Sequence, residues 1–272
     1  MADRPEPAAL LQRTVAVARE AGREILAIYA QDFSVEHKDD RSPLTAADMA
    51  AHHAILDGLQ VLTPGVPILS EEEADIPYAE RASWDRYWLV DPLDGTREFI
   101  KRNGEFTVNI ALIEDHEPVL GVIYVPVGGV CYFAVRGAGA HREGLGETAR
   151  GIHVRPWSGG HITIAGSRSH RDPHFDRFLA QFEEHTIISM GSSLKSCLVA
   201  EGRADVYLRL GPTSEWDTAA AQCIVEEAGG VMLDTELRPL RYNAKASLLN
   251  PYFVVCGDRT RDWGRYLAPC LE

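Results

Sequence analysis

The stretch Trp88-Leu-Val-Asp-Pro-Leu-Asp-Gly-Thr96 is the most informative part of this 272-residue chain. The apolar run Tyr87–Val90 predicts a strand that leads directly into Asp91. Pro92 restricts the backbone dihedral at the next position, and we expect Asp91 and Asp94 to lie on a tight turn after the strand. Two carboxylates three residues apart on such a turn can each bind one of two neighbouring metal ions. The stretch therefore predicts a metal site at a strand end.

The two residues after Asp94 fit a phosphate group. Gly95 allows a close approach of the backbone, and Thr96 supplies a hydroxyl. If a helix starts here, its free N–H groups face a phosphate. Asp, Pro, Gly and Thr are also ordinary turn residues, so a solvated turn explains the stretch when it is taken alone.

Three further acidic sites stand just after predicted strands or at helix starts. They are Ser70-Glu-Glu-Glu73, with Glu71 as the candidate ligand, then Asp48 and Asp217. Each has an ordinary explanation. The first could be a solvated acidic turn, Thr45 and Asp48 could form a capping box, and Asp217 could be a plain N-cap. Their joint occurrence favours a carboxylate cluster for a hard cation such as Mg²⁺.

The pattern of hydrophobic residues predicts α+β structure first and α/β structure after residue 157. We expect a one-faced helix at 8–30, a second helix that opens at Thr45, and a hairpin that turns at Pro126–Gly129. Strands are predicted at 66–69, 87–90, 107–113, 119–125, 130–135, 162–165, 186–189, 206–210 and 231–233, and further helices at 173–183, 193–201 and 217–228.

The net charge of −13 excludes the most common polyanion-binding functions. A surface of this sign repels nucleic-acid polymers and anionic membranes. It also means that an enzyme acting on a phosphate ester would need bound cations to reverse the local field.

The five cysteines are dispersed along the chain without a C-x-x-C pair, which favours a reducing compartment over a disulfide framework. The N-terminus lacks the basic and apolar regions of a secretory signal, and no stretch is long enough for an integral membrane segment. We therefore expect a cytoplasmic protein.

Taken in order, these motifs resemble the inositol-monophosphatase-like superfamily of lithium-sensitive phosphatases. The resemblance extends from about residue 8 to 256 and rests on Ser70-Glu71-Glu72, Trp88–Thr96, Trp216–Ala220 and Glu227–Gly230. It implies a layered αβαβα sandwich of the sugar-phosphatase type. It also implies an α+β subdomain at 1–157 with most metal ligands and an α/β subdomain at 158–272 with Asp217 and the nucleotide-binding elements.

Within that superfamily the chain resembles the CysQ-type 3′(2′),5′-bisphosphate nucleotidases. The segments that carry this resemblance are Ser42–Asp48, Asp94–Thr107, Ser167–His170, Gly191–Cys197 and Ala204–Leu210. Arg97 stands where many members carry Lys, which keeps the charge. Ser70 stands where inositol phosphatases usually carry Gly, which favours the nucleotidase branch.

The resemblance implies a role for each acidic residue. Two or three Mg²⁺ ions would bind: the first to Glu71, Asp91 and the Leu93 carbonyl, the second to Asp91, Asp94 and Asp217, and a weaker third near Glu71 and Asp48. Thr96, paired with Asp48, would orient the attacking water and help to deprotonate it, and Glu72 would position a further water. Three Mg²⁺ carry a charge of +6, and the five ligand and base carboxylates carry −5: Glu71, Asp91, Asp94, Asp217 and Asp48. Only the metal-loaded site would therefore attract a phosphate.

The substrate contacts are expected in the second half of the chain. Lys195, Ser192 and Arg209 are candidates for a second phosphate, because a point charge and a planar fork both suit phosphate oxygens. His170 could contact adenine, while Gly95 and Thr96 would lie by the reacting phosphate. Lys195 could instead be a solvated helix residue, and Arg209 a strand-end salt bridge.

The implied activity is Mg²⁺-dependent hydrolysis of the 3′-phosphate of adenosine 3′,5′-bisphosphate, or of its 5′-phosphosulfate analogue, by a metal-activated water. The products would be AMP and phosphate, in sulfate assimilation. The alternatives are an inositol or sugar monophosphatase and a non-catalytic nucleotide sensor, and the intact Thr96 and Asp48 count against the sensor. Lithium sensitivity and a monomer or homodimer are further expectations.

Overall fold

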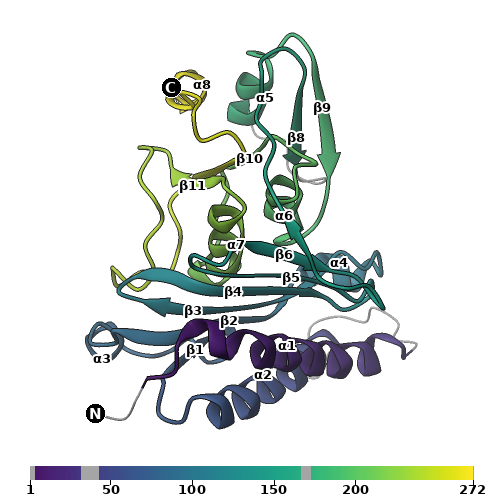
Figure 1. Ribbon diagram of the computed structural model, residues 1–272, viewed down its shortest axis with the longest axis vertical. Helices are drawn as coiled ribbons and strands as arrows, with labels where there is room; N and C mark the ends of the chain where they lie inside the picture. The colour runs from purple at the N-terminus through teal and green to yellow at the C-terminus, as the bar shows by residue number, and fades with distance from the viewer. Residues whose placement is uncertain (1–3, 32–42, 167–172, 272) are drawn as a thin grey trace.

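The computed structural model describes residues 4–31, 43–166 and 173–271 and has five layers (Figure 1). Two long helices, α1 (Pro7–Tyr29) and α2 (Pro43–Leu62), cover one face of a seven-stranded sheet. Helices α6 (Leu194–Ala200) and α7 (Glu215–Glu227) lie between this sheet and a five-stranded one. On the outer side of the second sheet are α5 (Pro173–Leu179) and α8 (Gly264–Leu271). The predicted αβαβα sandwich is confirmed.

The first sheet has the order β1-β2-β3-β4-β5-β6-β7, with β1 and β2 parallel and the other pairs antiparallel. Its strands are β1 (Ile68–Ser70), β2 (Arg86–Asp94), β3 (Thr107–Glu114), β4 (Glu117–Val125), β5 (Val130–Val135), β6 (Ala140–Glu143) and β7 (Arg150–Ile152). Three short helices lie among them: η1 (Glu71–Glu73), α3 (Tyr78–Arg81) and α4 (Thr96–Ile100).

The second sheet has the order β11-β12-β10-β8-β9. Its strands are β8 (Ile162–Gly166), β9 (His185–Ser189), β10 (Val206–Arg209), β11 (Val231–Asp234) and β12 (Phe253–Cys256). Strand β8 pairs in parallel with β9 and β10, whereas β12 pairs antiparallel with β10 and β11.

Strand β2 is buried on both faces, which explains its continuous apolar sequence. Trp88 and Val90 belong to the core under α1 and α2, while Tyr87 and Leu89 belong to the core shared with α6 and α7. Each such side chain contributes about 1.5–3 kcal/mol when it is fully buried. The strand that carries Asp91 is therefore held rigidly from both sides.

Helix α7 approaches the first sheet closely at Gly121 of β4. A Cβ atom at this position would collide with the Ala220 carbonyl and lie 3.0 Å from the Cys223 Cβ. The glycine and the small residues of α7 thus let helix and sheet pack at short range. This contact fixes α7, and with it Asp217, over the sheet.

Two local expectations are corrected. The stretch Asp91–Asp94 is not a turn after the strand, because β2 continues to Asp94 with an irregular register. Helix α2 begins at Pro43, so Thr45 lies inside its first turn and is not an N-cap. Proline suits the first helical position because its fixed φ and missing N–H cost nothing there.

The predicted hairpin at Pro126–Gly129 is confirmed, since Val125 pairs with Val130. Strands β6, β7 and β12 and helix α8 were missed. The first two are short and carry polar or exposed residues, and α8 contains Pro269, which argues against a helix in sequence.

The first sheet lies before residue 157 and the second after it, but the subdomain boundary stays a prediction. No helix in the described ranges combines the length and hydrophobicity that a membrane crossing requires.

Candidate active site

Three carboxylates from distant parts of the chain converge at one point. Glu71, Asp91 and Asp217 each offer an oxygen, and these oxygens lie within 4.8 Å of one another. The parallel pairing of β1 with β2 places Ser70 opposite Val90, so the next residues, Glu71 and Asp91, emerge side by side. Asp217 comes from the first turn of α7.

An extra residue in β2 brings Asp94 to the same side as Asp91. Asp91 pairs with Asn109 and Asp94 with Thr107, so three steps along β2 match two steps along β3. Residues three apart in a regular strand point to opposite faces, and a bulge of one residue reverses this. The backbone N–H of Leu93 donates to Asp91 Oδ1 at 3.0 Å and holds the irregular segment.

Asp94 is oriented by a serine that sequence reasoning did not single out. Its Oδ2 accepts hydrogen bonds from the Ser193 N–H (2.7 Å) and the Ser193 hydroxyl (2.9 Å). The Ser193 Oγ also lies 2.9 Å from the Asp217 carbonyl, and it accepts from Asn109 Nδ2 at 2.9 Å. Ser193 thus links Asp94 to α7. No local feature of the sequence distinguishes Ser193 from its neighbour Ser192, the residue predicted to contact a second phosphate.

Asp217 also helps to cap its own helix. The N-cap is Ser214, and Asp217 Oδ2 accepts the Ser214 N–H at 2.9 Å in a capping box. The alternative explanation of Asp217 as a plain N-cap is therefore wrong, because α7 begins at Glu215, two residues before the predicted start at 217. A carboxylate has a second oxygen, so a capping residue can still offer a ligand to a cation.

The electrostatics of the cluster favour the binding of positive charge. Burial raises the pKa of Asp91 well above its ordinary value, and repulsion from Asp94, Glu71 and Asp217 adds to it. Burial, then repulsion from Asp94, raises the pKa of Asp217 to about 7. The pKa values of Glu71 and Asp94 are raised mainly by burial too, although Lys195 opposes the shift at Asp94. Crowded carboxylates of this kind suit divalent cations with oxygen ligands.

Asp48 borders the cluster from α2. Burial, then repulsion from Glu72 and Glu71, raises the pKa of Asp48 to about 8, so these groups lie near one another. Thr96 is exposed at the first position of α4, a helix that contacts α2. Gly95 precedes it at φ +104°, and a Cβ there would lie 3.2 Å from the Phe106 Cα. Only glycine fits this left-handed conformation without strain.

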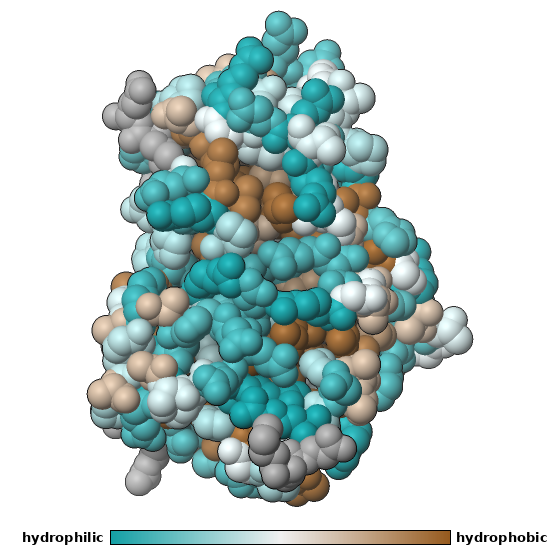
Figure 2. All heavy atoms as spheres, turned by 60° about the vertical axis from the view of Figure 1, so that its left-hand side comes forward, coloured by the Kyte–Doolittle hydropathy of each residue, from teal (hydrophilic) through white to brown (hydrophobic). Residues whose placement is uncertain are grey.

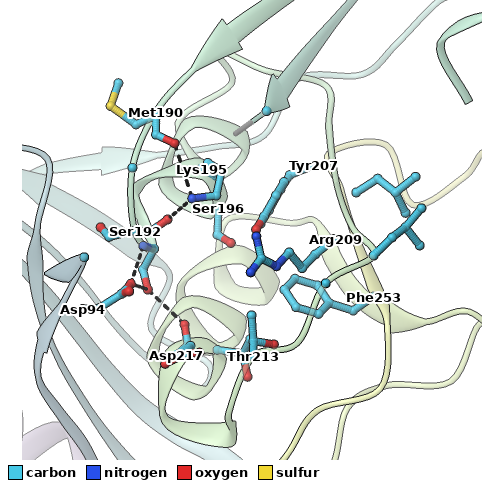
Figure 3. A pocket seen from close by; sticks show the side chains of 18 of the residues that line it. Asp94, Met190, Ser192, Lys195, Ser196, Tyr207, Arg209, Thr213, Asp217 and Phe253 are labelled. Carbon is cyan, nitrogen blue, oxygen red and sulfur yellow. Dashed lines mark hydrogen bonds between the residues drawn. The ribbon is translucent and has the colours of Figure 1, made fainter. Parts of the chain in front are cut away.

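A cavity of about 700 Å³ opens beside the carboxylates (Figure 3). Asp94 and Asp217 lie on one side of it with Ser192 close to Asp94, and Lys195, Tyr207, Arg209 and Phe253 lie further along its wall. Gly95 also lines the cavity. Figure 2 shows one face of the molecule, where hydrophobic surface lies in a hollow between two more polar parts. The cavity itself is mixed, with charged groups of both signs.

Lys195 is buried, so the solvated-helix explanation is wrong. It is 7% exposed, and its Nζ donates to the Ser192 carbonyl at 2.6 Å and lies 3.4 Å from the Met190 carbonyl. Its ammonium also lies 5.4 Å from the centre of the Tyr207 ring. Burial lowers the pKa of Lys195, and Asp94 opposes this shift. The surrounding protein thus leaves this charge only partly compensated.

Arg209 is half-buried on β10 and points into the same cavity (Figure 3). Its Nη2 donates to the Pro212 carbonyl at 3.1 Å, while its buried Nε has no hydrogen-bond partner within the described residues. It forms no ion pair with the described part of the chain, contrary to the salt-bridge explanation. His170 lies outside the described residues.

The comparisons with known proteins agree with this geometry. The model of the inositol monophosphatase family matches residues 6–261. The chain belongs to this family. Family members depend on metal ions, generally Mg²⁺, and the converging carboxylates provide suitable oxygen ligands.

Within the family, the chain is similar to 3′(2′),5′-bisphosphate nucleotidases named CysQ. It is 50% identical to those of Salmonella typhimurium and Escherichia coli K12, over 90% of this chain and 99% of theirs. The solved structure of CysQ from Bacteroides thetaiotaomicron matches with 45% identity and a TM-score of 0.83, covering 91% of this chain and 97% of that one. An inositol monophosphatase from Zymomonas mobilis matches with 26% identity and a TM-score of 0.80, covering 99% and 100%.

Proposed function

We propose that the chain is a Mg²⁺-dependent 3′(2′),5′-bisphosphate nucleotidase that hydrolyses the 3′-phosphate of adenosine 3′,5′-bisphosphate to AMP and phosphate. The 50% identity to curated nucleotidases along nearly their whole length supports the activity. The observation that carries it in the structure is the cavity, which has carboxylates at one end and the buried Lys195 with Arg209 elsewhere on its wall.

The carboxylate end fits two to three Mg²⁺ ions. Glu71, Asp91 and Asp217 converge, Asp94 and Asp48 border them, and the raised pKa values show that negative charge is crowded there. Bound Mg²⁺ would neutralise the phosphate oxygens and make a water more acidic. The Leu93 carbonyl is part of this proposed ligand set.

Thr96 and Asp48 are proposed to orient the attacking water. Thr96 is exposed at the first position of α4, and Asp48 lies on α2, the helix that contacts α4. Asp48 would accept a proton, and Glu72, beside it, would hold a further water. A general base works best when its pKa is near the working pH, and the Asp48 pKa of about 8 is consistent with that role.

The second phosphate is proposed to bind to Lys195 and Arg209, with Ser192 beside them. The Lys195 ammonium is buried and has protein carbonyls as its hydrogen-bond acceptors, and Arg209 Nε is buried without an acceptor within the described residues. An anion in the cavity would accept a hydrogen bond from Arg209 and neutralise the charge of Lys195. An inositol monophosphate has no second phosphate to offer, which distinguishes the two candidate substrate classes.

One phosphate-release assay tests the proposal. Adenosine 3′,5′-bisphosphate, its 5′-phosphosulfate analogue, inositol 1-phosphate and fructose 1,6-bisphosphate are compared at varied Mg²⁺, with and without Li⁺. We expect the adenosine substrates to have the highest kcat/KM, with loss of activity in Asp94→Asn. Preference for inositol 1-phosphate would overturn the assignment.

We further propose a cytoplasmic setting and a monomer or homodimer. All five cysteines are free and buried, which is consistent with a reducing compartment. Size-exclusion chromatography with light scattering would determine the oligomeric state.

A further inference from the structure

His52 is a fully buried histidine on α2 that is not part of the carboxylate cluster. It follows Asp48 by four residues, so the two side chains lie on the same helix face. Its Nδ1 lies 2.8 Å from the hydroxyl oxygen of Ser70, which is 2% exposed. The buried Nδ1 thus has the hydrogen-bond partner that a polar atom away from water requires.

Ser70 is the last residue of β1 and directly precedes Glu71. It occupies the N-cap position of η1, yet its side chain makes no capping hydrogen bond. Serine at an N-cap usually bonds to the backbone of its own turn. Here the hydroxyl bonds to His52 instead, and so connects the Glu71 turn to α2.

The surroundings of the ring indicate its tautomer. Nε2 lies 3.5 Å from Glu73 Oε1 and has no hydrogen-bond partner in the described residues. A lone pair on Nε2 would be repelled by that carboxylate, so we place the ring proton on Nε2. Nδ1 then accepts the hydrogen bond from the Ser70 hydroxyl.

We propose that His52 is a positioning residue that, through Ser70, holds the turn bearing Glu71 and Glu72 against the helix bearing Asp48. This inference rests on the proposed function. Carboxylates of like charge on the two elements repel each other, and a neutral hydrogen bond behind them opposes their separation. The distance between a metal ligand and the proposed proton acceptor is thereby set before any cation binds.

Titration calorimetry with MgCl₂ tests the proposal without relying on turnover. His52→Phe keeps an aromatic ring but removes both ring nitrogens. We expect about tenfold weaker Mg²⁺ binding, as when other residues that orient a metal ligand are lost. Ser70→Ala should weaken binding similarly, and the double variant should be no worse than either single one, because both remove the same bond. His52→Asn places an amide where Nδ1 lies and should restore most of the affinity.

Ile55→Val is the matched control, a buried α2 side chain that belongs to the core under the first sheet. It should lower Tm and leave Mg²⁺ binding unchanged. Unchanged binding in His52→Phe, or an equal loss in Ile55→Val, would overturn the role of His52 while leaving the proposed function intact. A wild-type chain that binds no Mg²⁺ and releases no phosphate would instead refute the proposed function itself.

Discussion

At one end of the cavity Asp94 and Asp217 stand with Glu71 and Asp91, whereas Lys195 and Arg209 occupy another part of its wall. We call these the acidic end and the basic end. The acidic end is assembled from β2, η1 and α7, around a strand that is buried on both faces. The basic end is built from α6 and β10 of the second half.

The acidic end and the basic end favour ligands of opposite charge. At the acidic end the carboxylates raise one another's pKa values, so the end needs added cations. At the basic end the buried Lys195 ammonium donates to the Met190 and Ser192 carbonyls, and these bonds supply no balancing anion. The buried Arg209 Nε has no acceptor among the described residues. A substrate with two phosphates fits a cavity of this kind, because one phosphate would bind through cations and the other directly to the protein.

The largest expected effect is at the acidic end. Asp91→Asn should lower kcat on the order of 10³-fold for every phosphate ester, as expected when a central electrostatic group is lost. In EDTA the same variant should have a higher Tm than the wild type, because it removes a buried like charge. Steady-state kinetics and thermal unfolding measure the two effects. Asp57→Asn, an exposed change on α2, should alter neither. A lower Tm for Asp91→Asn in EDTA would contradict the electrostatic account.

The next effect is at the basic end and depends on the substrate. Lys195→Met keeps the length of the buried side chain and removes the charge. We expect KM for adenosine 3′,5′-bisphosphate to rise about 10- to 100-fold, since hydrogen bonds to charged groups contribute about 1.5–3 kcal/mol. KM for a nucleoside 3′-monophosphate should change little. Lys101→Met, at an exposed lysine, controls for long-range attraction. Equal effects on both substrates would remove Lys195 from the second-phosphate site.

Two adjacent serines test whether the acidic end and the basic end act independently. Ser193→Ala removes a hydroxyl that donates to Asp94. We expect about tenfold weaker activation by Mg²⁺, because residues that hydrogen-bond to a metal ligand orient it. Ser192→Ala should instead raise KM for the bisphosphate with little change in Mg²⁺ dependence. Titrations of Mg²⁺ at saturating substrate separate the two. The same phenotype in both variants would show that the two ends are not independent.

The smallest effect is the pH dependence of stability. Asp48 and Asp217 have folded pKa values of about 8 and 7, above their ordinary values, so the folded state binds more protons than the unfolded state between about pH 4 and 8. Stability in EDTA should therefore fall as pH rises through this window, by a few degrees in Tm between pH 6 and 8. Stabilisation by Mg²⁺, which competes with protons, should grow over the same range.

Differential scanning fluorimetry at pH 6, 7 and 8, with EDTA or Mg²⁺, measures both trends. Asp48→Asn removes one titrating group, so its Tm in EDTA should fall less than that of the wild type. A wild-type Tm that rises with pH in EDTA would contradict the raised pKa values.

Most helices and strands could be predicted from sequence because their signals are local, whereas the layered sandwich was implied by the resemblance to a known family. The apolar run before Asp91 and the one-faced pattern of α1 follow from strand and helix periodicity. Prediction failed where local preference was overruled. Pro92 and Gly95 suggested a turn, yet β2 continues as a bulged strand because its pairing with β3 and burial on both faces outweigh that preference.

The sequence by itself determined which chemistry is available: acidic residues after strands, a lysine and an arginine in the second half, and the motifs of a metal-dependent phosphatase family. Only the tertiary structure decided which of these groups meet. Ser193 reaches Asp94 across 99 positions of the chain, and His52 on α2 reaches Ser70 at the end of β1. Such pairings depend on how helices and sheets pack, which no local pattern of residues encodes. The burial of Lys195 likewise follows from packing, because a lysine on a short helix is equally compatible with solvent.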